Sequence, residues 1–175
     1  MKISRIRLDK DFYLDEFVDP VTFFTEVDHG LSKIDVRVVK ITQLLRNYHG
    51  KSIGVNGWWK HLPVDMIVFD PVAFLILMES KKVPVWSGLR TELCDIGAPK
   101  SAHKLGRAID PKGDEKKLMQ IVRDNAKQFY DLGLRRLEDI SITNGWLHMD
   151  THNANCKPNS IRVIDKTKCT ETIYL

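Results

Sequence analysis

Two short stretches of the sequence carry the side chains best suited to chemistry. His103 and Asp110 lie close together, and His148 follows about forty residues later. Two imidazoles and one carboxylate can supply three ligands to a zinc ion, and catalytic zinc sites use three protein ligands and leave the fourth position open. Such an ion polarises a bound carbonyl and lowers the pKa of a water molecule to near 7. Spacing alone is weak evidence, because a lone His–Asp pair is more often a surface pair or a structural group.

The two stretches also match known motifs. The first fits S-x-H-x-x-G-x-A-x-D through Ser101, His103, Gly106, Ala108 and Asp110. The second fits W-x-H-x-D through Trp146, His148 and Asp150. Both resemble the motifs of the zinc D-alanyl-D-alanine carboxypeptidase and L-alanyl-D-glutamate endopeptidase family, which cuts peptidoglycan peptides. Residues 87–90 resemble the S-G-x-R segment of that family, and residues 12–17 resemble the N-terminal hook of its phage-associated branch. The resemblance therefore spans about residues 12–152.

The resemblance implies a role for each matched residue. It implies zinc ligands at His103, Asp110 and His148. Arg90 matches an arginine near the scissile carbonyl, where a permanent cation can stabilise the oxyanion as it forms. Ser101 and Trp146 are expected to contact the substrate.

One position departs from the family pattern. Many relatives carry Glu or Asp as general base three residues before the last ligand His, but here that residue is Gly145. Glu138 is our first candidate for the base, because a hairpin through an Asn-Gly turn would bring its strand beside His148. Asp150 is the second candidate, although it could equally orient His148 from outside the ligand set.

Three helices are expected to support these residues. Hydrophobic periodicity predicts a helix over residues 33–48, with Ser32 in a capping box and Gly50 as the stop. A second is predicted over residues 71–81, with Asp70 as N-cap and an all-apolar surface that indicates burial on every side. A third is predicted over residues 114–132.

Short strands are expected between and after these helices. Within residues 146–150, alternation places Trp146, His148 and Asp150 on one face of the strand. The predicted strands are residues 52–56, 83–86, 107–110, 134–138, 146–150 and 161–164. The mixture favours an α+β fold in which a small, mostly antiparallel sheet packs against helices, and the resemblance implies the fold of the zinc D-Ala-D-Ala carboxypeptidases and hedgehog-like domains. We expect a single domain over residues 1–175, peptidase-like over 12–152, with a C-terminal extension over 153–175.

Composition narrows the function classes further. The net charge is only +4, and the sequence contains no block of like charges. Both observations argue against a nucleic-acid partner. No apolar run reaches 18 residues, so no membrane span is expected. The N-terminal residues lack the apolar core of a signal peptide. The sequence thus predicts a zinc metallopeptidase. The resemblance implies that it is phage-encoded, made in the host cytoplasm, and acts on the cell wall or is carried in a virion with other virion proteins. The alternative is a non-catalytic zinc-binding module of a phage particle.

Overall fold

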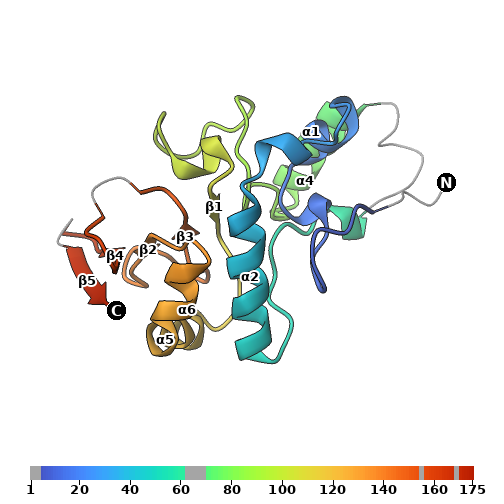
Figure 1. Ribbon diagram of the computed structural model, residues 1–175. Coiled ribbons are helices and arrows are strands. Elements are labelled where there is room, and N and C mark those ends of the chain that lie inside the picture. Colours follow the sequence, from blue (N-terminus) through green and yellow to red (C-terminus); the bar gives the residue numbers. More distant parts are fainter. Residues whose placement is uncertain (1–4, 62–69, 154–155, 168–169) are drawn as a thin grey trace.

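The computed structural model describes residues 5–61, 70–153, 156–167 and 170–175, and within these ranges the fold is α+β, as predicted (Figure 1). The α-helices are α1 Pro20–Thr25, α2 Val36–His49, α4 Pro71–Ser80, α5 Glu115–Asp124 and α6 Ala126–Asp131. Short 3-10 helices are η1 Leu14–Glu16, η2 Leu31–Lys33, η3 Trp58–His61 and η4 Ala102–Leu105. The strands are β1 Ala108–Ile109, β2 Arg136–Glu138, β3 Met149–Asp150, β4 Ser160–Ile164 and β5 Thr170–Tyr174.

The strands that the structure describes form one sheet in the order β1-β3-β2-β4-β5. The expectation of a mostly antiparallel sheet is wrong, because β2 and β4 run parallel and the sheet is therefore mixed. The chain returns from β2 into β3 on one side, then crosses to the other side of β2 before it enters β4. That crossover gives β4 the same direction as β2. Residues 160–164 and 170–174, which lie within the expected C-terminal extension, thus supply two strands of the same sheet.

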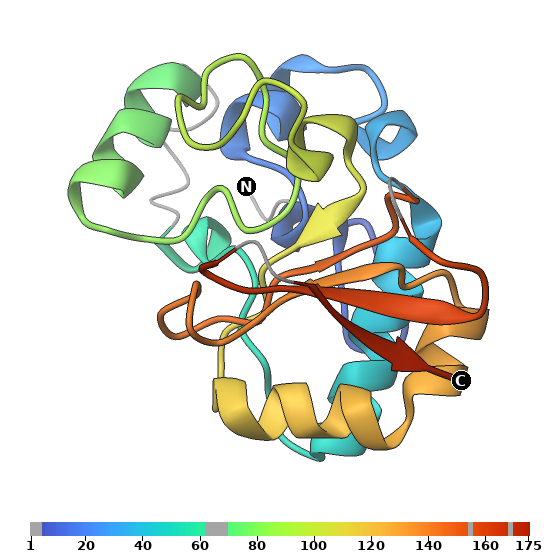
Figure 2. The ribbon, with the colours of Figure 1, turned by 90° about the vertical axis from the view of Figure 1, so that its left-hand side faces the viewer.

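One face of the sheet is covered by helices. Leu147 and Met149 point into a core that they share with Leu137, Ile161 and residues of α2, α5 and α6. Figure 2 shows these helices along one side of the strands, with α4 and the loops that follow it apart from them in the upper left of the view. A second core joins α1 and α4 around Trp58 and Phe74. The opposite face of β2 and β3 is free to carry polar side chains.

Two of the predicted helices begin or pack differently from expectation. The helix predicted from residue 33 begins at Val36, because residues 31–33 form η2 and the Asp35 carboxylate, rather than Ser32, accepts from the Arg37 N–H. Helix α4 begins at Pro71 behind the Asp70 cap, as predicted. It is not buried on every side: Phe74, Leu75 and Met78 are buried, whereas Val72 and Ile76 are exposed.

The third predicted helix is two helices. Asn125 separates α5 from α6, and its side-chain amide donates to the Ile121 carbonyl, which competes with the backbone ladder. The strands predicted over 52–56 and 83–86 are absent from these described segments, and only Gly54 forms an isolated bridge, to Lys112. The sequence interpretation missed β5. Residues 12–17 contain η1, and Phe12 and Phe17 on either side of it are buried.

Within the described ranges, none of the helices combines the length and apolar character that a membrane span requires.

Candidate metal centre

A cavity of about 390 Å³ opens on the polar face of β2 and β3. All eight residues selected from the sequence contribute to its lining: Arg90, Ser101, His103, Asp110, Glu138, Trp146, His148 and Asp150. They come from segments far apart in the chain, and the sheet and η4 bring them together. The alternation predicted for residues 146–150 is confirmed, because Leu147 and Met149 face the core while their neighbours face this cavity.

Local geometry explains how His103 and Asp110 meet. Ser101 caps η4 by accepting from the His103 N–H, and η4 ends at Gly106, whose φ is 64°. A Cβ at Gly106 would lie 1.7 Å from the Lys33 carbonyl oxygen, so only glycine permits this approach. The chain then turns into β1, which delivers Asp110 to the cavity.

The three predicted ligand atoms converge. His103 Nε2 lies 3.2 Å from Asp110 Oδ1 and 3.2 Å from His148 Nδ1, and His148 Nδ1 lies 2.8 Å from Asp110 Oδ1. Ligands about 2.0–2.1 Å from a tetrahedral ion stand roughly 3.3 Å apart. All three side chains are buried, and together they could hold a metal ion.

The outer atoms of both imidazoles are held by hydrogen bonds. His103 Nδ1 lies 2.7 Å from the Gly88 carbonyl oxygen, which can only accept, so Nδ1 is the protonated nitrogen. His148 Nε2 lies 3.2 Å from Asp150 Oδ2. A proton on each outer nitrogen leaves the inner nitrogens of the neutral rings with free lone pairs. Such outer partners fix the tautomer and ring orientation of metal-binding histidines.

The charges of the site follow from these contacts. Burial lowers the pKa of His103 despite its contact with Asp110, which favours the neutral imidazole. Burial would raise the pKa of Asp110, but hydrogen bonds with His103 and His148 outweigh it and hold that pKa well below its usual range. Burial also opposes charge on His148, yet Asp110 and Asp150 raise its pKa to about 10. A metal ion must therefore displace a proton from His148 when it binds.

Arg90 is tied to the ligand set. One guanidinium nitrogen donates to Asp110 Oδ2 at 2.7 Å, and Nε donates to the Trp86 carbonyl at 3.0 Å. Its side chain is only 14% exposed, so the pair is not a surface salt bridge. By engaging Oδ2, Arg90 turns Oδ1 of Asp110 toward the two histidines. Its remaining nitrogen, Nη1, lies near Gly97, where an added Cβ would come within 3.3 Å of it.

The two candidate bases have different surroundings. Asp150 is almost fully buried and accepts from Arg136, from the His152 N–H and from His148. Burial opposes its charge, but His148 and Arg136 lower its pKa overall. Glu138 pairs across the strands with His148, since its N–H donates to the His148 carbonyl in the register Leu137↔Met149. This register puts Glu138 on the cavity face.

Sequence reasoning did not identify Arg136 or the Gly88 carbonyl. Arg136 pairs with Asp150 at 2.8 Å and faces it across β2 and β3. Its position two residues before Glu138 is a signal, because residues i and i+2 share a strand face. A backbone carbonyl such as that of Gly88 leaves no signal in residue types.

Comparison of the chain with family models, with curated proteins and with solved structures found no match. The interpretation of the site therefore stands on its geometry and on the motifs.

Proposed function

We propose that this protein is a zinc-dependent peptidase that cuts peptidoglycan stem peptides. One observation carries the proposal: His103 Nε2, His148 Nδ1 and Asp110 Oδ1 face one another within a buried cluster, with outer partners that leave their lone pairs inward. Once His148 gives up its proton, these three atoms are acceptors that can hold a cation between them. Two imidazoles, one carboxylate and an open cavity fit a catalytic zinc site better than a closed structural one.

Zinc held there would supply Lewis acidity, which polarises a carbonyl and makes water more acidic. The other groups in the cavity divide the remaining tasks. Glu138 takes a proton from the attacking water and returns it to the leaving amine. Arg90 directs its free guanidinium nitrogen at the developing oxyanion. Ser101 and Trp146 line the wall against which the peptide lies.

Asp150 is a positioning residue in this proposal. Its oxygens are already occupied by Arg136, the His152 N–H and His148, so its accepting capacity is largely used. Glu138 accepts no hydrogen bond from any side chain or backbone group that the structure describes, and its carboxylate is available to a water molecule.

The motif resemblance to the phage-associated branch supports a role in lysis or in a virion. In that setting the protein is made in the host cytoplasm and reaches the wall with the help of other phage components.

Gly145 favours a second candidate, a zinc-binding module without hydrolysis. It occupies the position at which many relatives of the resembled family place the base, with a φ of 90°, and its N–H donates to the Glu115 carboxylate. One experiment separates the two functions. Zinc-loaded protein is incubated with purified peptidoglycan, and released amino groups and fragment masses are measured with and without a chelator. Chelator-sensitive cleavage supports the peptidase, whereas bound zinc with no cleavage on any preparation supports the module.

Arg90→Lys tests the oxyanion role in the same assay. Lysine keeps the charge but loses the planar fork that reaches both Asp110 and the substrate. We expect strongly reduced turnover with zinc still bound. Turnover equal to that of the wild type would remove Arg90 from the mechanism.

A further inference from the structure

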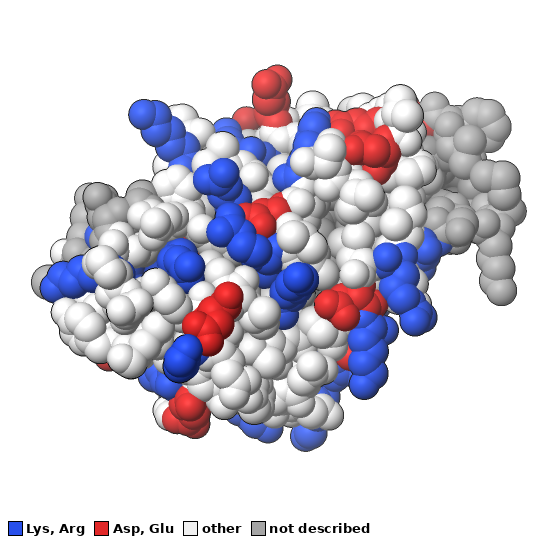
Figure 3. Space-filling model, viewed as in Figure 1, with Lys and Arg blue, Asp and Glu red and all other residues white. Residues whose placement is uncertain are grey.

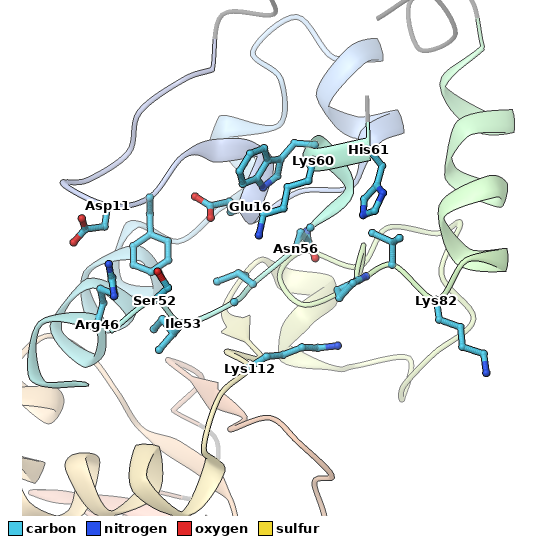
Figure 4. Close-up of a pocket in the computed structure, with 17 residues that line it drawn as sticks. Asp11, Glu16, Arg46, Ser52, Ile53, Asn56, Lys60, His61, Lys82 and Lys112 are labelled. Carbon is cyan, nitrogen blue, oxygen red and sulfur yellow. The ribbon is translucent and has the colours of Figure 1, made fainter. Parts of the chain in front are cut away.

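A second hollow of about 550 Å³ lies apart from the metal centre and shares no lining residue with its cavity. Its walls come from η1, η3, the end of α2, residues 52–57, residues 82–84 and Lys112. Figure 4 shows Lys60 and His61 directed toward the middle of the hollow, Lys112 along its lower edge, and Lys82 turned outward. Lys112 connects the hollow to the metal centre, because its backbone forms bridges to Gly54 in the wall of the hollow and to Trp146 in the wall of the metal-centre cavity.

The hollow is basic, and its cations are not neutralised. Arg46, Lys60, Lys82 and Lys112 line it, and none of them lies within salt-bridge distance of a carboxylate in the described part of the chain. On the face of the molecule seen in Figure 1, cations and acids are interspersed (Figure 3). Cations gathered around a concave surface without acidic partners raise the local concentration of anions.

The two acids in the wall do not cancel this charge. Asp11, whose carboxylate accepts from the neutral Gln43 side chain at 2.8 Å, carries a single negative charge and offsets at most one of the four cations. Burial raises the pKa of Glu16 to about 7, although the Tyr13 N–H and Arg5 favour its charged form. Near neutral pH a large fraction of Glu16 is therefore protonated and does not repel an anion.

The wall also offers a donor that the protein does not use. The indole Nε1 of Trp59 is buried and has no hydrogen-bond partner among the described residues. Unsatisfied buried donors are rare in folded proteins, and one beside a hollow indicates a missing partner. A hydroxyl or an anionic oxygen of a ligand would satisfy it.

We propose that this hollow binds a polyol or sugar chain that carries repeated anionic groups. The cations come from separate elements around the rim, so several anionic groups fit better than a single small ion. The hydroxyls of such a chain match the Trp59 donor and the Ser52 side chain in the wall. The identification of the chain as an anionic polymer of the cell wall rests on the proposed function, since the wall also carries the peptide substrate.

A nucleic acid fits this hollow less well. Bases bind single-strand sites largely by stacking on open aromatic faces. The Trp59 ring is already covered, because the Arg5 guanidinium lies 3.8 Å from its centroid and Lys60 Nζ lies 5.2 Å from it.

Binding measurements on the full-length, zinc-loaded protein test the proposal. The probes are poly(glycerol phosphate), polygalacturonate and a single-stranded oligothymidylate, compared at equal anionic charge and fixed salt. The first two separate phosphate from carboxylate as the source of the anion. The test variant is Lys60→Gln/Lys112→Gln. The matched control is Lys116→Gln/Lys117→Gln, which removes two exposed lysines of α5 outside the hollow.

We expect wild type to bind at least one of the two polyol or sugar chains more tightly than the oligonucleotide. In the test variant that binding weakens by roughly tenfold or more, and the salt slope falls by about one per lysine. The control variant binds as wild type does, and zinc content stays the same in all three proteins. Equal binding by the test variant and wild type, or preference for the oligonucleotide, overturns the proposal. Wild-type protein that cleaves the peptide but binds neither polymer would contradict this site alone. Wild-type protein that binds a polymer but does not cleave the peptide would contradict only the peptidase.

Discussion

The metal centre and the basic hollow place a buried carboxyl group in opposite situations. At the metal centre, Asp150 meets Arg136, His148 and a backbone N–H, and these contacts keep it charged despite burial. In the hollow, Glu16 has a backbone N–H from Tyr13 and a more distant arginine, and burial keeps much of it neutral.

The difference shows what each region can do. The metal centre is a closed network in which each inner atom is aimed by an outer partner, as a site with fixed geometry requires. Among the described residues, the cations of the hollow have no carboxylate within salt-bridge distance and the Trp59 Nε1 has no hydrogen-bond partner, which suits a ligand that brings its own charges. Mutations at the metal centre should therefore change metal affinity and turnover. Mutations in the hollow should change the affinity for an anionic ligand, the salt dependence of that affinity, and the pH dependence of stability.

The largest effect is expected from His148→Ala. The variant removes one of three converging ligand atoms and frees Asp150 and Asp110 from a shared partner. Zinc affinity should fall by more than the 10–100-fold that loss of an outer partner typically costs, and cleavage should fall with it. Elemental analysis of dialysed protein measures the metal. His49→Ala, at the end of α2 and outside the cavity, is the control and should keep one zinc per chain. Full zinc occupancy in His148→Ala would refute the ligand assignment.

Glu138→Gln should affect turnover and leave the metal in place. The amide cannot accept a proton, so the rate of cleavage should fall by about 10²–10⁴-fold, the usual contribution of a general base. The strand pairing through the Glu138 N–H does not depend on the side chain. Rates on peptidoglycan fragments and zinc content are measured together. Unchanged cleavage would move the base elsewhere.

Asp150→Asn should separate orientation from proton transfer. Asparagine keeps the shape of the side chain but removes the charge that holds Arg136 and His148. We expect zinc affinity to fall by roughly 10–100-fold, and added zinc to restore much of the activity. A competition titration with a chelator gives the affinity. Activity that stays lost at saturating zinc, with Glu138→Gln still active, would give Asp150 the role of base.

The sequence could predict the polar face of β3 because Leu147 and Met149 alternate with His148 and Asp150. When one face of a sheet is buried, such alternation assigns the apolar residues to the buried face and the polar residues to the other. It could not place Glu138, because a shift of one residue in the pairing with β2 would turn that side chain to the core face. Arg136 was missed for the same reason. Only the register Arg136↔Asp150 makes it a partner of the site.

Other features lay beyond local patterns. The parallel pairing of β2 with β4 depends on the path of the chain after residue 150, which residue types do not encode. Strand β5 could have been predicted, since Thr, Ile and Tyr in residues 170–174 favour strands. The basic hollow gathers residues from segments between positions 11 and 112. No short motif marks such a site, and the net charge of the whole chain, +4, does not indicate that cations gather in one place.

The smallest effect is expected from Glu16→Gln, and it tests the neutral carboxyl in the hollow. The pKa of Glu16 rises from 4.5 to about 7 on folding, so the folded state binds this proton more tightly. The resulting stabilisation is complete below pH 4.5 and is lost as the pH rises through 7. Glutamine does not titrate, and its carbonyl can still accept from the Tyr13 N–H. The free energy of unfolding of the variant, relative to wild type, should therefore increase between pH 5 and pH 8, by about 1–2 kcal/mol after allowance for partial exposure. Urea titrations at the two pH values measure it. Asp28→Asn is the control, because hydrogen bonds from Ser32 and Gly30 lower the pKa of Asp28, so its contribution changes only at more acidic pH. A relative stability of Glu16→Gln that does not change between pH 5 and pH 8 would mean that Glu16 is charged in the folded protein, and the hollow would then hold an acid that opposes anion binding.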